Sequence, residues 1–191
     1  MKWMYITMNE TLKAIAERYS CRDFSGAPLT SEQEKCLIDA ALAAPSAVNR
    51  QPWRLIVVRD KAIIEEMDAE GMEILANGED KTAYERMKSR GGELFYNAPF
   101  LVLILSDGSK WGTLDSGILC QTIAIAAHSI GLATCIVGMA AIPLGGPNGA
   151  DLKKRLHFPD GFEFAIGILA GTANSGKDPH ELDYDKVTYI G

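Results

Sequence analysis

The sequence lacks the short motifs that usually identify a protein catalyst. It contains no C-x-x-C pair, no G-x-S-x-G and no G-x-x-x-x-G-K-[ST] pattern, so a thioredoxin-type site, a nucleophile elbow and a P-loop are not indicated. The glycine-rich stretch 145–149 lacks the G-x-G-x-x-G spacing and does not directly follow an expected strand, which argues against a Rossmann fingerprint. We therefore expect no catalytic side chain and infer that a cofactor supplies the reactivity.

Metal-ligand spacing is missing as well. The three histidines, His128, His157 and His180, are far apart in the sequence, and we expect His128, on an apolar helix, to be a satisfied core residue. Four cysteines are spread along the chain, and two of them, Cys120 and Cys135, lie in apolar surroundings that are typical of buried thiols. We expect no metal site, and nothing in this cysteine usage requires an oxidising compartment.

Composition indicates one globular domain. The chain has 191 residues, of which 47% are hydrophobic and 23% charged, enough for a sizeable core. The net charge of −6 and the scattered basic residues argue against nucleic acid as the main partner. The N-terminal residues lack the apolar core of a signal peptide, and the most apolar helix candidate is too short to span a membrane. We expect a cytoplasmic protein with no membrane partner.

Apolar spacing and turn residues predict an α+β domain of strands between long helices. Capping-box spacing places helix starts at Thr7–Glu10 and at Ser31–Glu34. A first helix running into residues 18–22 is expected, followed by helices over 31–44, 61–76, 81–90, 113–130 and 151–157. Strands are expected over 54–59, 100–105, 133–137, 162–170 and 186–190, with the apolar run 100–105 buried on both faces. A Gly/Pro-rich loop is expected over 143–149.

Two segments do not suit an isolated chain. The helix over 113–130 is apolar nearly all round, so it is buried either under its own sheet or against a second copy of the chain. The tail after Gly171 is too polar to fold on itself, yet it ends in the strand expected over 186–190. This tail could wrap a neighbour and extend its sheet.

The segment from Pro45 to Trp53 is a candidate ligand loop. Pro45 and Pro52 remove two backbone donors and fix two φ angles, so the segment is neither regular helix nor inner strand. Between the prolines stand the hydrogen-bonding side chains of Ser46, Asn49 and Gln51. A rigid polar loop between apolar elements can hold a ligand. A loop that only caps its helix and turns the chain would have the same residue pattern.

A second candidate site begins at Arg18. The guanidinium of Arg18 can fork onto a phosphate, and Ser20 can add a neutral donor. If the first helix continued, Arg22 would face the same side as Arg18. These residues suit an anionic cofactor, and the alternative is a charged helix end exposed to water.

Taken together, the motifs resemble one family. The stretches RYSCRDF (18–24) and AAPSAVNRQPW (43–53), Asn97-Ala98-Pro99 before a strand, IGLATCIVG (130–138) and FAIGILAG (164–171) follow one another in order. In this order they strongly resemble the nitroreductase family of FMN-dependent oxidoreductases, and the resemblance spans almost the whole chain.

The resemblance implies an α+β fold with a central, mostly antiparallel sheet flanked by helices. Residues 1–191 would form a single nitroreductase-like domain that works as an intertwined homodimer. Residues 172–191 would be a C-terminal tail that embraces the partner subunit. Two FMN molecules would lie at the dimer interface, each contacted by both chains, which agrees with the two unusual segments described above.

The resemblance also assigns residues to the cofactor. Arg18 and Ser20 match contacts to the phosphate and ribityl groups, and Tyr19 contributes a backbone or ring contact. Arg22 matches a basic residue near N1 and O2 of the flavin, where reduction places negative charge that a fixed cation stabilises. In the tail, Lys177 is the candidate for the FMN phosphate, with His180 as a second candidate.

Further cofactor contacts are implied by two other segments. The loop that reaches the flavin from the other subunit matches Pro45, Ser46, Ala47 and Asn49, with Gln51 near it. Val137 and Gly138 match a strand end whose backbone approaches the flavin near N5, where a glycine admits close approach.

The implied activity is electron transfer from NADH or NADPH, through FMN, to an electron-poor small-molecule acceptor such as a nitroaromatic compound or a quinone. One shared flavin face implies a ping-pong order. Three alternatives remain open at this point. These are a non-catalytic FMN-binding sensor or store, a flavoenzyme on the same fold that performs reductive dehalogenation or flavin degradation, and a cofactor-free interaction domain.

Overall fold

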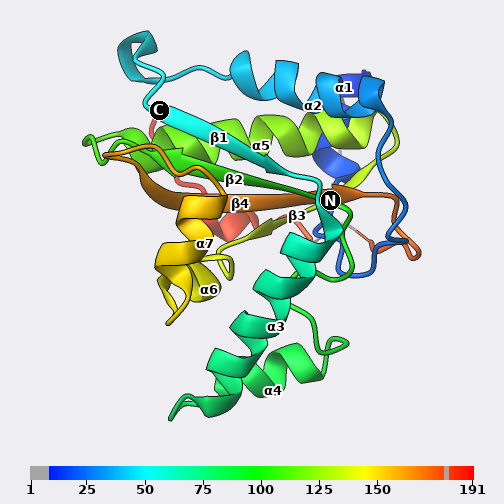
Figure 1. The fold of residues 1–191 in the computed structure, drawn as a ribbon. Helices are drawn as coiled ribbons and strands as arrows, with labels where there is room; N and C mark the ends of the chain where they lie inside the picture. The colour runs from blue at the N-terminus through cyan, green and yellow to red at the C-terminus, as the bar shows by residue number, and fades with distance from the viewer. Residues whose placement is uncertain (1–8, 179–180) are drawn as a thin grey trace.

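A four-stranded sheet with helices on both faces forms the centre of the molecule (Figure 1). The structure is a computed structural model that describes residues 9–178 and 181–191. The strands are β1 (Trp53–Val58), β2 (Phe100–Ser106), β3 (Ala133–Val137) and β4 (Glu163–Gly171), in the order β1-β2-β4-β3. Every pairing is antiparallel, which confirms the predicted α+β class.

Strand β2 is buried along its whole length. Phe100, Val102 and Ile104 pack into the core on one face of the sheet. Leu101 and its alternate neighbours Leu103 and Leu105 pack into the core on the other face, as the two-residue period of a strand requires. The expectation of a strand buried on both sides is therefore confirmed.

The helices divide between the two faces. One face carries α1 (Glu10–Glu17), α2 (Ser31–Leu42) and α5 (Gly112–Ser129); the other carries α3 (Lys61–Asn77), α4 (Thr82–Lys88), α6 (Ala141–Gly145) and α7 (Gly149–Arg155). The α3–α4 pair extends away from the sheet (Figure 1). No helix in the described ranges has both the length and the apolar character needed to cross a bilayer.

Helix α5 is covered on one side only. Leu119, Ile123 and Ala127 are buried against the sheet, whereas Leu114 is 58% exposed and Ile118 is 37% exposed. Packing against its own sheet and against α1 and α2 thus accounts for only part of this apolar helix. Its outer stripe is left uncovered by the residues that the structure describes.

Two helix starts differ from the predicted capping boxes. Helix α2 is capped by Thr30 and Gln33, each side chain accepting from the backbone N–H of the other, rather than by Ser31 and Glu34. Helix α1 is capped by Asn9, which accepts from the N–H of Leu12. Thr7, the predicted cap, lies outside the described residues.

Three further expectations are corrected by the structure. Helix α1 ends at Glu17, so Arg18 and Arg22 do not share a helical face. The predicted loop 143–149 contains most of α6. Residues 184–186 form a short 3₁₀ turn, and no strand follows over 186–190 within the described chain.

The junction of α6 and α7 depends on a glycine. A Cβ placed on Gly149 would lie 2.4 Å from the carbonyl oxygen of Leu144 and 2.8 Å from its carbonyl carbon. These are backbone atoms of α6, so the first turn of α7 packs directly on the end of the preceding helix. Only a residue without a side chain permits this approach.

Candidate functional site

The segment that follows α1 lies along the free edge of the sheet. Ser20 forms an isolated parallel bridge with Thr134, and the N–H of Cys21 donates to the carbonyl of Thr134 over 2.8 Å. Since β3 is an edge strand, this contact brings the arginine-bearing segment to the same edge as Val137 and Gly138. A Cβ on Gly138 would meet nothing within 4 Å, so the strand end is open to a ligand.

Arg18 has the property expected of a ligand-binding side chain. It follows the last residue of α1 and leaves the helix with extended backbone geometry. Its Nε–H is buried and finds no acceptor among the described residues. A buried donor without a partner costs about 1–3 kcal/mol, and an anionic oxygen placed there would remove that cost. The donor set therefore fits a phosphate group.

The start of the tail lies beside the same segment. The hydroxyl of Tyr19 donates to the carbonyl of Ser175 over 2.9 Å, and the N–H of Ser25 donates to the carbonyl of Thr172 over 2.9 Å. Lys177 follows Ser175 by two residues in the sequence, and its contact with the FMN phosphate stays a prediction. The other candidate, His180, lies outside the described residues.

Positive charge lies near β3. Burial raises the pKa of the Cys135 thiol to about 11, and the nearby guanidinium groups of Arg22 and Arg90 oppose that rise. Arg22 is thus close enough to the strand to act on Cys135, and its role toward the flavin stays a prediction. Arg90, in the turn after α4, was not among the predicted site residues, because nothing local in the sequence relates it to β3. Burial also raises the pKa of Cys120, to about 12, as expected for a buried thiol.

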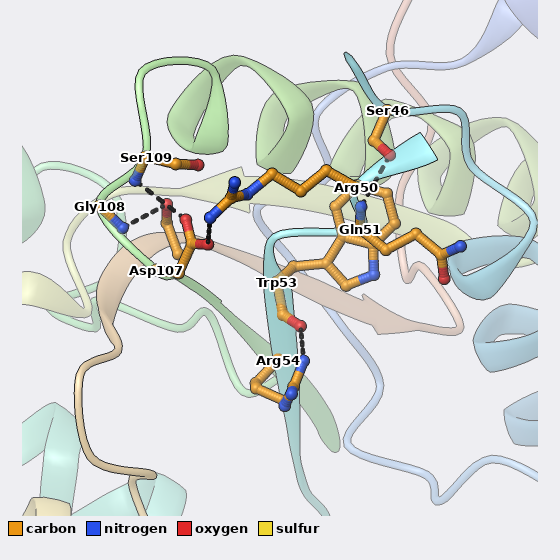
Figure 2. A network of polar contacts seen from close by, with 9 residues as sticks. Ser46, Arg50, Gln51, Trp53, Arg54, Asp107, Gly108 and Ser109 are labelled. Carbon is orange, nitrogen blue, oxygen red and sulfur yellow. Dashed lines mark hydrogen bonds and ion pairs between the residues drawn. The ribbon is translucent and has the colours of Figure 1, made fainter. Parts of the chain in front are cut away.

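The loop from Pro45 to Trp53 is held in an unusual backbone conformation. Val48, Asn49 and Gln51 all have positive φ, at 49°, 53° and 51°, a region that non-glycine residues rarely adopt. Ser46 Oγ accepts from the N–H of Gln51 over 2.9 Å (Figure 2), and Gln51 Nε2 donates to Asn49 Oδ1 over 3.0 Å. Strained backbone of this kind is characteristic of ligand-binding segments.

The loop is fixed to the N-terminal end of α5. Asp115, whose side chain is buried, accepts from the N–H of Ala47 over 3.1 Å, and Arg50 reaches Asp107 over 3.2 Å (Figure 2). Hydrogen bonds from Ser109 and the contact with Arg50 lower the pKa of Asp107. Asp115 was not predicted, since it is 68 residues away from Ala47 along the chain.

The two halves of the candidate site lie at opposite ends of α5. The loop contacts Asp115 in the first turn of α5, whereas Glu17, just before Arg18, lies 3.9 Å from His128 in the last turn. Thirteen residues of helix at 1.5 Å each separate these contacts by about 20 Å. The structure does not bring the loop and Arg18 together within one chain.

His128 is half-buried beside Glu17, so its predicted position in the core is wrong.

Comparisons with known proteins identify the family of the chain. The model of the nitroreductase family matches residues 15–171. A crystal structure of a nitroreductase with bound FMN from Desulfitobacterium hafniense DCB-2 is 46% identical, with a TM-score of 0.93 over 97% of this chain and 100% of that one. A 4-nitrobenzoate reductase of Pseudomonas putida is 26% identical over 93% of this chain and 94% of its own length. An FMN reductase (NAD(P)H) of Bacillus subtilis strain 168 is 28% identical over 96% and 76%, respectively.

Proposed function

Because the chain belongs to the nitroreductase family, we propose that it is an FMN-dependent NAD(P)H oxidoreductase that reduces an electron-poor acceptor of the nitroaromatic or quinone type. The observation that supports this most directly is the buried, unpartnered Nε–H of Arg18. It lies in a chain that is 46% identical to a nitroreductase with bound FMN. An anionic cofactor would satisfy this donor.

The phosphate end of FMN would be held by residues of one chain. Arg18 supplies a fork of charged donors, and Ser20 and Tyr19 follow it along the sheet edge. Lys177 would add a second cation from the tail. Arg22 and the open strand end at Val137 and Gly138 would face the ring system.

The loop residues would come from a second copy of the chain. In one chain the loop and Arg18 are about 20 Å apart along α5, and a two-fold axis would bring the loop of each chain to the Arg18 segment of the other. The exposed apolar stripe of α5, with Leu42 and Val48 at 58% and 97% exposure, would be covered in such a homodimer. The tail adds further apolar side chains that its own chain leaves exposed, among them Tyr189 and Ile190.

The chemistry would belong to the cofactor. When bound, FMN would supply a two-electron carrier between NAD(P)H and the acceptor, and a single face shared by both would impose a ping-pong order. The protein residues position the cofactor, exclude water and tune its potential. Arg22 contributes a fixed positive charge close to β3, and no side chain needs to act as an acid or a base.

Replacing Arg22 by alanine is expected to lower the flavin reduction potential. A fixed cation stabilises the negative charge of the reduced ring, and a loss of about 1.4 kcal/mol in that stabilisation corresponds to about 30 mV for a two-electron couple. Spectroelectrochemical titration of the FMN-loaded protein measures the shift. Arg22→Lys should restore part of it. An unchanged potential in Arg22→Ala would remove Arg22 from this role.

The proposed function is tested by the visible spectrum of the purified protein under nitrogen. We expect a flavin band that bleaches when NADH or NADPH is added and returns when a quinone or a nitroaromatic compound follows. A flavin band that neither nucleotide bleaches would indicate an FMN-binding sensor or store. A colourless protein that FMN does not turn yellow would indicate a cofactor-free domain.

A further inference from the structure

The carboxylate of Asp23 connects residues 18–24, called the cofactor segment, to the tail. Asp23 Oδ1 accepts from the side-chain amide of Asn174 over 2.8 Å, and Asp23 Oδ2 accepts from the hydroxyl of Ser175 over 3.1 Å. Both oxygens of Asp23 are thus used by two successive residues of the tail, which leads toward Lys177. These contacts join residues 151 and 152 positions apart, and no local feature of the sequence indicates them.

Backbone pairing alone does not hold this part of the tail. Phe24 and Ala173 form an antiparallel bridge, and the N–H of Asn174 donates to the carbonyl of Asp23 over 3.0 Å. Beyond Asn174, no further backbone hydrogen bond joins the two segments in the part of the chain that the structure describes. Ser175 is held by the bond from its hydroxyl to Asp23 and by the bond that its carbonyl accepts from the hydroxyl of Tyr19.

The distance from this junction to the phosphate-binding residues is short. Lys177 is two residues beyond Ser175, at most about 7 Å of extended chain, and its own side chain adds a comparable reach. Ser175 is bonded to Tyr19, the immediate neighbour of Arg18. A tail fixed at Ser175 therefore keeps the ammonium of Lys177 within range of an anion bound at Arg18.

The partners of Asp23 also matter electrostatically. Its carboxylate takes hydrogen bonds from an amide and a hydroxyl, both neutral. Within the described chain it forms no ion pair within 4.0 Å with Arg18, Arg22 or Lys177. The cations of this region are therefore left available for an anionic ligand.

We propose that Asp23 is a positioning residue that fixes the start of the tail so that Lys177 contacts the phosphate of FMN. Asp23 does not touch the cofactor in this scheme and acts only through Asn174 and Ser175. The inference depends on the proposed function, since it assigns a tail contact within the FMN site.

The test compares FMN with riboflavin, which lacks the phosphate. Dissociation constants are measured by flavin fluorescence on the apoprotein of the wild type, Asp23→Ala, Lys177→Ala and the double variant. We expect Asp23→Ala and Lys177→Ala each to weaken FMN binding about fivefold to tenfold, which is within the range of an ordinary net hydrogen bond. Riboflavin binding should change less than twofold, and the double variant should bind FMN like Lys177→Ala alone.

Control variants keep the outcome specific. Asp39→Ala removes an exposed carboxylate that pairs only with Lys35 on α2, and Lys186→Ala removes a tail lysine that pairs with Asp183; both should leave FMN affinity unchanged. Ser175→Ala removes one donor to Asp23 without altering the cofactor segment, and it should reproduce part of the loss. It also tests the proposal if Asp23→Ala does not fold.

Two results would overturn the positioning role. One is an equal loss of FMN and riboflavin affinity in Asp23→Ala, which would indicate a general structural effect. The other is a double variant whose loss equals the product of the single losses, because independent residues add in free energy. If riboflavin binds too weakly to measure, the comparison of the single and double variants with FMN alone decides between the two explanations. A wild-type protein that binds neither flavin would instead contradict the proposed function.

Discussion

Replacing Arg18 by alanine is expected to weaken FMN binding roughly 10- to 150-fold. Hydrogen bonds to a charged group contribute about 1.5–3 kcal/mol, and every 1.4 kcal/mol changes the dissociation constant tenfold. The stability of the apoprotein should not fall in parallel, because the substitution removes a buried donor that has no acceptor within the described chain. A loss of FMN affinity without a loss of apoprotein stability distinguishes a ligand-binding arginine from a structural one.

Affinity is measured by flavin fluorescence and stability by urea denaturation of the apoprotein. Arg18→Lys keeps the charge but loses the planar fork, so its affinity should lie between those of the wild type and Arg18→Ala. Arg59→Ala is the matched control, since Arg59 is an exposed arginine that pairs with Glu34 over 3.2 Å. Unchanged FMN affinity in Arg18→Ala would place the phosphate elsewhere.

Substituting alanine for Gly149 is expected to destabilise the protein by about 2–3 kcal/mol, in the range typical of overpacking in a close-packed interior. The added Cβ would meet the backbone of Leu144 at 2.4 Å and 2.8 Å, and a helix backbone cannot move aside as a flexible side chain can. Helix α7 would have to separate from α6, which disturbs the buried side chains of Leu144 and Leu152.

The measurement is the midpoint of urea denaturation at a fixed FMN concentration, because a ligand bound to the native state adds stability by mass action. Gly145→Ala provides the control within α6: its Cβ would meet nothing within 4 Å. Alanine is the better helix former by about 0.8–1 kcal/mol in a helix interior, so a small gain or no change is expected there. Equal losses at both glycines would contradict the steric explanation.

The regular elements were largely predictable because their signals are local. The continuous apolar run of β2 and the long apolar stretch of α5 each identify an element without reference to the rest of the chain. The start of α2 was displaced by one residue because Thr30-Ser31-Glu32-Gln33-Glu34 contains two overlapping capping patterns, of which the structure uses the first. A proline in α6 suggested a loop, yet Pro143 lies in the first turn, where backbone N–H groups have no helical partner.

The errors at the two ends of the chain have a non-local cause. Helix α1 stops before Arg18 because Ser20 and Cys21 bond to Thr134, more than a hundred residues away. The expected strand 186–190 does not form within the described chain, and its apolar residues Val187, Tyr189 and Ile190 are exposed. Pairing with a partner's sheet stays a prediction, as do the homodimer and the cytoplasmic location.

The candidate site was predictable only where a motif carries it. The residues from Arg18 to Arg22 and from Pro45 to Gln51 follow from the sequence resemblance. Asp115, Asp23 and Arg90 do not, because each acts on a segment that is distant in sequence. Such supporting contacts depend on topology, and a single sequence does not reveal topology at that resolution.

The projection of the α3–α4 pair from the sheet has a practical consequence for engineering. The turn between the two helices, residues 78–81, is mostly exposed and lies away from the edge strand β3 (Figure 1). Lengthening an exposed turn costs little, about 0.6 kcal/mol for each doubling of its length. This tip is therefore a suitable place to attach a dye, an affinity tag or an inserted peptide without disturbing the edge of the sheet at β3.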